Sequence, residues 1–183
     1  MSKNLPSQIT EIEKAGFAVL QNGNAVLRSV DAIVSQIVAG DSYIATTRER
    51  NLGNNDRMNL LIENPVGSGK RVLVLFIIDA EGKLNYNSYC DMTVTTKTEL
   101  TPTSLLIPST GQLVAKVYNE VVYTGGNMRS DDLIPLGSGG RATGGSSNTV
   151  FTCINEGCSI LTEITNISGQ TRDVGFKVQI TEF

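Results

Sequence analysis

From about residue 42 to its end, the sequence is a succession of short strand-like runs that turn residues separate. Residues 174–181 show the pattern most clearly, because apolar side chains alternate there with polar residues or glycine. A period of two places these side chains on one inward face: Val174, Phe176, Val178 and Ile180. Further strands are predicted at residues 43–50, 57–63, 71–78, 84–95, 104–107, 112–123, 149–154 and 159–165. Since no crossover helices separate them, we expect an all-β fold, an antiparallel β-sandwich or jelly-roll-like domain.

Two of these predicted strands differ in the surroundings that they require. Residues 71–78 are apolar almost throughout, which predicts a strand covered on both faces. Residues 84–95 alternate over their whole length and predict one long strand with a polar side toward solvent or another subunit. Its other side would carry Leu84, Tyr86, Ser88, Cys90, Met92 and Val94, with Cys90 as a small core residue.

The first 41 residues follow a different pattern and predict a short helical N-terminal extension, which precedes a β-sandwich domain at residues 42–183. Four aliphatic residues are spaced by four, three and four positions, which places them on one face of a helix. They are Val26, Val30, Ile33 and Ile37. Such a helix either packs on the sandwich or serves as a self-associating stem.

Residues 127–148 form the least regular part of the sandwich domain, and we expect a flexible Gly/Ser-rich loop there. Residues 137–148 are of low complexity and include Arg141. This segment is either a surface loop or an arm that becomes ordered against a neighbouring subunit or a ligand.

The segment Glu63–Lys70 looks like a phosphate-binding loop but lacks its spacing. A Walker A loop requires Gly-x4-Gly-Lys followed by Ser or Thr. Asn64 stands at the position of the first glycine, and Arg71 follows Lys70. The segment therefore predicts a glycine turn that joins two strands as a hairpin, and we expect no cofactor.

The composition excludes most catalytic chemistry. The 183 residues include no histidine, which removes Ser-His-Asp and Cys-His arrangements and the usual zinc sites. The acidic pairs Asp79/Glu81 and Asp131/Asp132 lack the spacing of a calcium loop. The net charge of −3 gives no electrostatic reason to bind nucleic acid. We expect a protein that is not an enzyme; a carboxylate-dependent hydrolase, with two acids converging in a cleft, is the enzymatic alternative.

The arginines of the first strands form a group whose role depends on the fold. If their strands are neighbours, Arg48, Arg50, Arg57 and Arg71 make a basic strip. They would either pair with Glu49, Asp56 and Glu63 or dock on an acidic protein surface. With no catalytic, cofactor or metal residues, the candidate site residues are possible assembly contacts: Val26, Val30, Ile33, Ile37, Arg48, Arg50 and Arg141.

Cysteines and targeting signals give weak constraints. Cys153 and Cys158 flank a four-residue loop, and a hairpin there would let them form a disulfide under oxidising conditions. The first residues lack the apolar core of a signal peptide, so we expect synthesis in the cytoplasm and no use of the glycosylation sequence at Asn166. No apolar run approaches the roughly 18 residues of a membrane helix, and we expect no membrane partner.

Residues 58–78 carry a resemblance to a known class of proteins. Residues 61–70 read Leu-Ile-Glu-Asn-Pro-Val-Gly-Ser-Gly-Lys and run into alternating valines and leucines. This phrase is similar to one in β-sandwich virion proteins of tailed bacteriophages, where it opens a sandwich strand. The resemblance implies a structural protein of the particle, namely a capsid decoration or cement protein, a head fibre or a tail component.

The resemblance and the fold together lead to one functional expectation. We expect a virion protein, made in the host cytoplasm, that self-associates, with a trimer favoured, and docks on capsid or tail proteins. The alternative is a receptor- or glycan-binding module of a tail or fibre tip, which would present some of the five tyrosines: Tyr43, Tyr86, Tyr89, Tyr118 and Tyr123.

Overall fold

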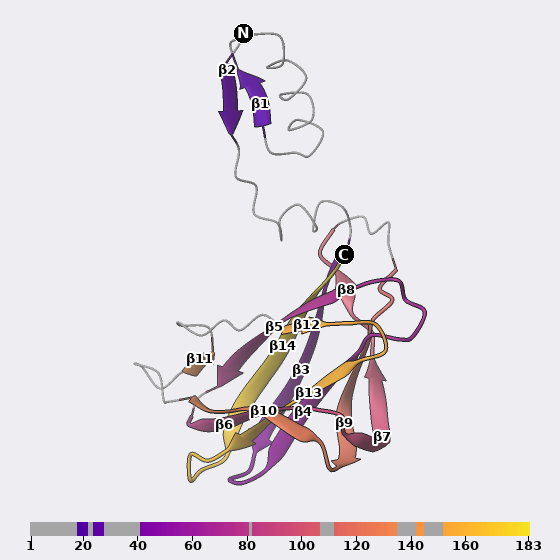
Figure 1. Cartoon of the computed structure of the whole chain (residues 1–183). Coiled ribbons are helices and arrows are strands. Elements are labelled where there is room, and N and C mark those ends of the chain that lie inside the picture. Colours follow the sequence, from indigo (N-terminus) through magenta and orange to yellow (C-terminus); the bar gives the residue numbers. More distant parts are fainter. Residues whose placement is uncertain are drawn as a thin grey trace.

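The computed structural model describes residues 18–21, 24–27, 41–80, 82–106, 112–134, 142–144 and 152–183, and every regular element in them is a strand (Figure 1). The strands are β1 (Ala18–Gln21), β2 (Asn24–Leu27), β3 (Ser42–Leu52), β4 (Arg57–Glu63), β5 (Val72–Ala80), β6 (Leu84–Cys90), β7 (Thr93–Leu100), β8 (Thr103–Ser104), β9 (Lys116–Thr124), β10 (Asn127–Ile134), β11 (Ala142–Gly144), β12 (Thr152–Ile154), β13 (Ser159–Asn166) and β14 (Arg172–Glu182). The all-β prediction is therefore confirmed.

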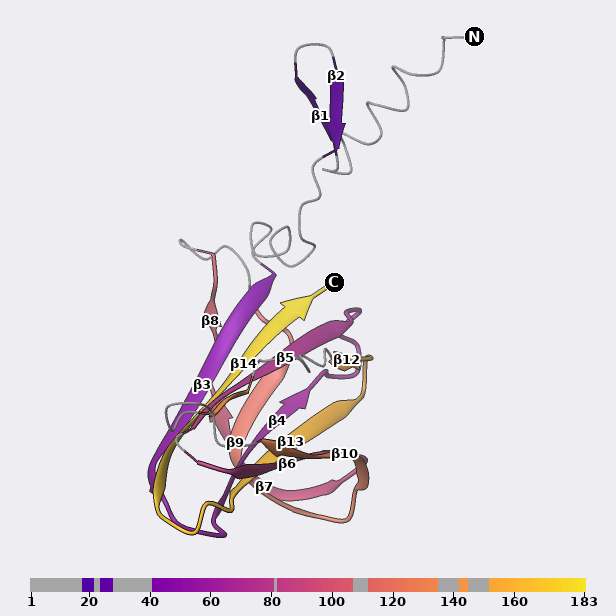
Figure 2. The ribbon, with the colours of Figure 1, turned by 90° about the vertical axis from the view of Figure 1, so that its left-hand side faces the viewer.

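Two antiparallel sheets pack face to face as a β-sandwich (Figure 2). The β13 sheet has the strand order β10-β6-β13-β4-β9-β7, and the β14 sheet has the order β11-β5-β14-β3-β8, with β12 also paired to β5. From β3 to β6 the chain changes sheet at each connection, and it does so again from β10 to β11 and from β12 to β14. These connections are therefore corners of the sandwich rather than hairpins.

The core lies between the two sheets and is built from the alternating rows of their strands. In β14 the side chains of Val174, Phe176, Val178 and Ile180 are fully buried, as the alternation predicts. Leu60, Ile62, Ile160 and Ile164 of the β13 sheet belong to the same cluster. Burying aliphatic and aromatic side chains supplies about 1.5–3 kcal/mol each, which makes these rows the main source of stability.

Strand β5 departs partly from its predicted surroundings. Its inward residues Val72 and Val74 are fully buried in the core. Its outward residues Leu73, Leu75 and Ile77 are only half-buried. The prediction of cover on both faces is therefore correct for one face of the strand and only partly correct for the other.

The predicted strand at residues 84–95 is broken in two. Asp91 has a φ of 58°, a left-handed conformation that ends β6 at Cys90, and β7 begins at Thr93. Met92 and Val94 consequently pack against a second apolar cluster instead of the core between the sheets. Cys90 is half-buried and belongs to neither cluster, so its assignment to the core was wrong.

The N-terminal extension is also different where it is described. Asn24–Leu27 pairs with Ala18–Gln21 as an antiparallel ladder in which Val26 faces Val19. The helix prediction is therefore not confirmed for these residues, because pairing with Ala18–Gln21 satisfies their backbone hydrogen bonds in place of helical ones. Val30, Ile33 and Ile37 lie outside the described residues.

The loop predicted at residues 127–148 begins later than expected. Its first eight residues form β10, which pairs with β6 along its length, and residues 142–144 form β11. The loop prediction is therefore wrong for these two segments. Arg141 lies outside the described residues.

Two buried asparagines hold the corners at opposite ends of the paired strands β4 and β13. Asn166 is fully buried, and its amide nitrogen donates to the backbone oxygens of Leu52, Gly53 and Gln170 at 2.8, 3.2 and 2.8 Å. Its side-chain oxygen accepts from the amide of Ser168 at 3.0 Å. Asn166 thus joins the β3–β4 corner to the β13–β14 corner, and its burial leaves the glycosylation sequence without an accessible acceptor.

Asn64 has the corresponding role at the other end. Its amide nitrogen donates to the oxygens of Lys70 at 2.9 Å and Ile154 at 3.2 Å. Its backbone exchanges hydrogen bonds with Cys158 and Gly157 at 2.9 and 2.8 Å. The β4–β5 and β12–β13 corners are therefore held as one unit.

We predict that the substitution Asn166→Asp lowers the free energy of unfolding by about 3 kcal/mol or more. The aspartate loses the donor that serves three carbonyl oxygens and brings a buried charge against them. Urea denaturation measures the effect. Asn54→Asp is the matched control, because Asn54 is exposed and only accepts a hydrogen bond, from Gly169 at 2.8 Å. Equal losses in the two variants would contradict the proposed role of Asn166.

Candidate functional site

The glycine turn at residues 64–71 is a corner between sheets whose amides bind a carboxylate of the same chain. Gly67 and Gly69 have φ values of 80° and 64°, which turn their N–H groups toward one point. Both amides donate to the carboxylate of Glu156, with 3.1 Å between the Gly69 nitrogen and Oε2. The groups that hold a phosphate in a phosphate-binding loop are therefore already satisfied, and the hairpin prediction for this turn was wrong.

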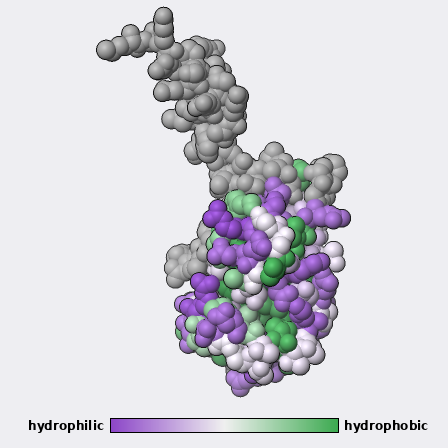
Figure 3. All heavy atoms as spheres, turned by 45° about the vertical axis from the view of Figure 1, so that its right-hand side comes forward, coloured by the Kyte–Doolittle hydropathy of each residue, from purple (hydrophilic) through white to green (hydrophobic). Residues whose placement is uncertain are grey.

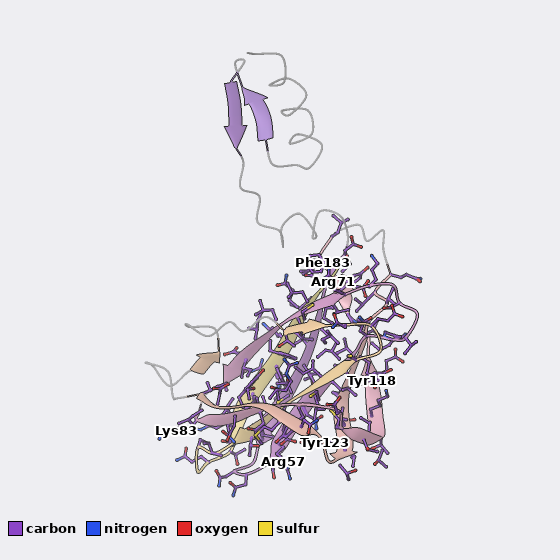
Figure 4. All side chains as sticks on the ribbon, viewed as in Figure 1. Arg57, Arg71, Lys83, Tyr118, Tyr123 and Phe183 are labelled. Atoms are coloured by element: carbon purple, nitrogen blue, oxygen red, sulfur yellow. The ribbon has the colours of Figure 1, made fainter. Side chains whose placement is uncertain are left out.

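The four arginines do not form one strip. Arg48 and Arg50 lie on β3, Arg57 begins β4 in the other sheet, and Arg71 exchanges backbone hydrogen bonds with Phe183. Figure 4 shows Arg71 beside Phe183 at one end of the sandwich and Arg57 at the other. Only the two β3 arginines are neighbours, so the predicted strip is reduced to this pair.

The partners of the arginines also differ from those expected. Arg48 pairs with Asp173 at 3.5 Å, and Arg57 pairs with Glu163 at 3.4 Å. Both arginine side chains remain more than half exposed, at 57% and 63%. The Arg48–Asp173 pair is exposed at both side chains and contributes little stability, whereas Arg57 contacts a carboxylate that is only 5% exposed. The exposed parts of both arginines remain open to other partners.

A second apolar cluster lies on the outer face of the β13 sheet. Leu61 and Leu161 point away from the core because they alternate with core residues, yet both are fully buried. Residues of β7 and β9 complete their cover, together with tyrosines: Tyr89, Met92, Val94, Tyr118, Val121 and Tyr123. Strands β7 and β9 therefore fold partly over this face.

A short side-chain bridge holds β9 over this face. The side chain of Asn59 donates to the oxygen of Val121 and accepts from its amide, both at 2.9 Å. The preceding residue, Glu120, has a φ of 51°, which interrupts the regular ladder. Asn59 thus replaces a strand neighbour where β9 leaves β4.

The one buried acid on this face is Glu163, which is 4% exposed. It accepts hydrogen bonds from Arg57 at 3.4 Å and from the Tyr123 hydroxyl at 3.2 Å. The rings of Tyr123 and Tyr89 pack with their centroids 5.6 Å apart. No local pattern in the sequence predicts this cluster, because Glu163 has the position of an ordinary outward polar residue in an alternating strand.

The tyrosines divide into two groups. Tyr43 is buried and Tyr86 is half-buried against the core, and burial raises the pKa of both hydroxyls. Tyr89, Tyr118 and Tyr123 gather half-buried on the outer face of the β13 sheet, where the Lys97 ammonium lies 3.9 Å from the Tyr118 ring centre. Figure 4 labels two of these three tyrosines, Tyr118 and Tyr123, both of which lie on β9.

The remaining candidate groups are dispersed. Cys153 and Cys158 are exposed free thiols on a corner between sheets, not across a hairpin. Six large apolar side chains are exposed among the described residues, two of them on β10, and the face in Figure 3 shows small apolar patches among hydrophilic ones. They are Val66, Val122, Met128, Leu133, Ile167 and Phe183.

Within the described part of the chain, three or more potential metal ligands of the His, Cys, Asp and Glu types do not come together. The same residues include no helix long and apolar enough to cross a membrane. Comparison of the chain with protein-family models, curated proteins and solved structures found no match.

We predict that Tyr123 contributes to a loss of stability at alkaline pH. Burial, and next the Glu163 carboxylate, raise the pKa of Tyr123 well above its ordinary value of 10.0. The contribution of Tyr123 to the free energy of unfolding is therefore complete below about pH 10 and is lost as the pH rises further. Between pH 10 and 11.5 the urea midpoint should fall less steeply in Tyr123→Phe than in the wild type. It should still fall in the variant, because Tyr43 and Tyr86 remain and their pKa values are also raised. Tyr118→Phe, which leaves Glu163 untouched, is the control, and identical slopes in all three proteins would refute the assignment.

Proposed function

We propose that this chain is a non-enzymatic structural protein of a tailed-phage particle that self-associates and docks on the capsid as a decoration, cement or head-fibre protein. The observation that carries the proposal is the order of its strands. With β11 and β12 counted as one position, the sheets contain the orders β3-β14-β5-β11 and β4-β13-β6-β10. Chain order alternates between them as in a jelly roll, an architecture that recurs in viral capsid domains. The phrase at residues 58–78 supports the same proposal.

The attachment of the N-terminal extension fits a docking protein. The chain enters the sandwich at Asp41, whose oxygen accepts from the amide of Glu182 at 2.9 Å. The entry point and the C-terminal strand end therefore lie at the same end as Arg71 and Phe183. In this proposal the extension associates as a trimer at this end of the sandwich and is helical beyond β2. The corners held by Asn166 lie at the opposite end and are directed away from the anchoring point.

The proposal predicts that the full-length chain forms a defined oligomer and binds purified phage capsids. Sedimentation velocity over a hundredfold range of concentration measures the mass, and co-sedimentation with capsids measures docking. We expect a trimer and saturable binding. A chain that stays monomeric and also fails to bind capsids or tails would contradict the proposal.

A second candidate function, receptor or glycan binding at a fibre tip, has one observation in its favour. The half-buried tyrosines Tyr89, Tyr118 and Tyr123 lie on one face, and aromatic rings are common in sites that combine apolar and polar contacts. A glycan-array screen tests it. Hits that Tyr118→Ala abolishes would favour this function over assembly, whereas a screen without hits would remove it.

A further inference from the structure

Strand β10 offers a long free edge at one end of the β13 sheet. It pairs only with β6 among the described strands, and its residues from Ser130 to Ile134 keep a regular register. Asp131 and Asp132 lie in this regular run, and both are exposed. Leu133, which follows them, is 59% exposed. Arg129, also exposed, precedes the regular run, so the edge presents unpaired backbone groups, a net charge of −1 and an apolar side chain.

Strand β3 offers a second free edge in the β14 sheet. On the side away from β14, β8 covers only Tyr43 and Ile44, so the edge from Ala45 onward has no partner among the described strands. Its pairing with β14 is regular from Ala45 to Glu49. Arg48 and Glu49 lie in this run and Arg50 follows it, and all three are exposed, so this part of the edge carries a net charge of +1.

The charges on these two edges decide which pairings are possible. Two β10 edges would bring two net negative edges together, and two β3 edges would bring two net positive edges together, which is unfavourable across strands. One β3 edge and one β10 edge bring opposite charges together. Backbone pairing at a free edge provides affinity, and the charges select the partner.

We propose that the free edge of β3 in one copy of the chain docks on the free edge of β10 in a second copy. The two edges lie on opposite flanks of the sandwich, as Figure 2 shows with β3 at the left and β10 at the right. A contact between different edges of identical chains is heterologous, and it closes into a ring when the rotation between copies permits. The inference deepens the proposed function, because it rests on self-association and names the surface that mediates it.

The test uses charge reversal in the full-length chain. Arg48→Glu/Arg50→Glu and Asp131→Arg/Asp132→Arg should each weaken association about tenfold or more, because each sets like charges against each other. The variant that combines all four substitutions restores opposite charges and should associate within about threefold of the wild type. Association of the wild type should weaken between 0.05 and 0.5 M NaCl, measured by sedimentation velocity.

Controls separate the edge contact from misfolding. Lys116→Glu reverses an exposed charge on β9, which pairs with β4 and β7 and with neither edge strand, and should leave association unchanged. If a double variant unfolds, Arg50→Glu and Asp132→Arg provide single reversals in exposed side chains without a described ion pair, and urea midpoints establish that they are folded.

The outcomes distinguish this inference from the proposed function. Association that survives reversal at either edge would overturn the β3–β10 contact and leave the proposed self-association intact. Sensitivity to reversal at one edge alone would show pairing between identical edges and would also overturn it. A wild-type chain that is monomeric but binds capsids would refute the edge contact and retain docking, and a monomer that binds nothing would refute both.

Discussion

The fold depends on satisfying backbone groups where strands leave their sheets. Because the chain crosses between sheets at most connections, its corners bring N–H and C=O groups close to the core without a strand neighbour. Buried polar side chains take the place of that neighbour. Asn166 and Asn64 do so at the two ends of β4 and β13, and Glu182, 2% exposed, accepts from the amides of Val114 and Ala115 at 2.9 and 2.8 Å. Apolar rows hold the sheets together, and these side chains determine where each strand turns.

The same principle explains why the glycine turn is a structural feature. Its convergent amides form a site for an anion, and a neighbouring corner supplies that anion as Glu156. The resemblance to a phosphate-binding loop is real at the level of local backbone chemistry. It stops there because the first-glycine and hydroxyl positions differ and no helix follows among the described residues.

The sequence predicts those features of the fold that depend on neighbouring residues within one strand, and not those that depend on contacts between distant strands. The β14 row and the all-β class follow from alternation, which burial directly produces. The break at Asp91 could not be predicted, because the alternation of Cys90, Met92 and Val94 continues across it without interruption. Only the positive φ of Asp91 turns Met92 and Val94 toward the outer cluster. Asn166 and Glu163 could not be identified either, because a buried asparagine reads as a turn residue and a buried outer-face acid as a solvated one. Their burial arises from strands distant in the sequence.

The edges of the sandwich differ in a way that bears on assembly. Strand β7 is a third long edge, but its register with β9 shifts twice, between Val94 and Thr96 and between Thr96 and Thr98. Such bulges twist an edge away from further pairing. The edges of β3 and β10 each keep a regular run of five residues. These two carry opposite net charges, which disfavour pairing of each edge with its own kind and favour pairing with the other. Irregular geometry therefore protects one edge, and charge makes the other two selective.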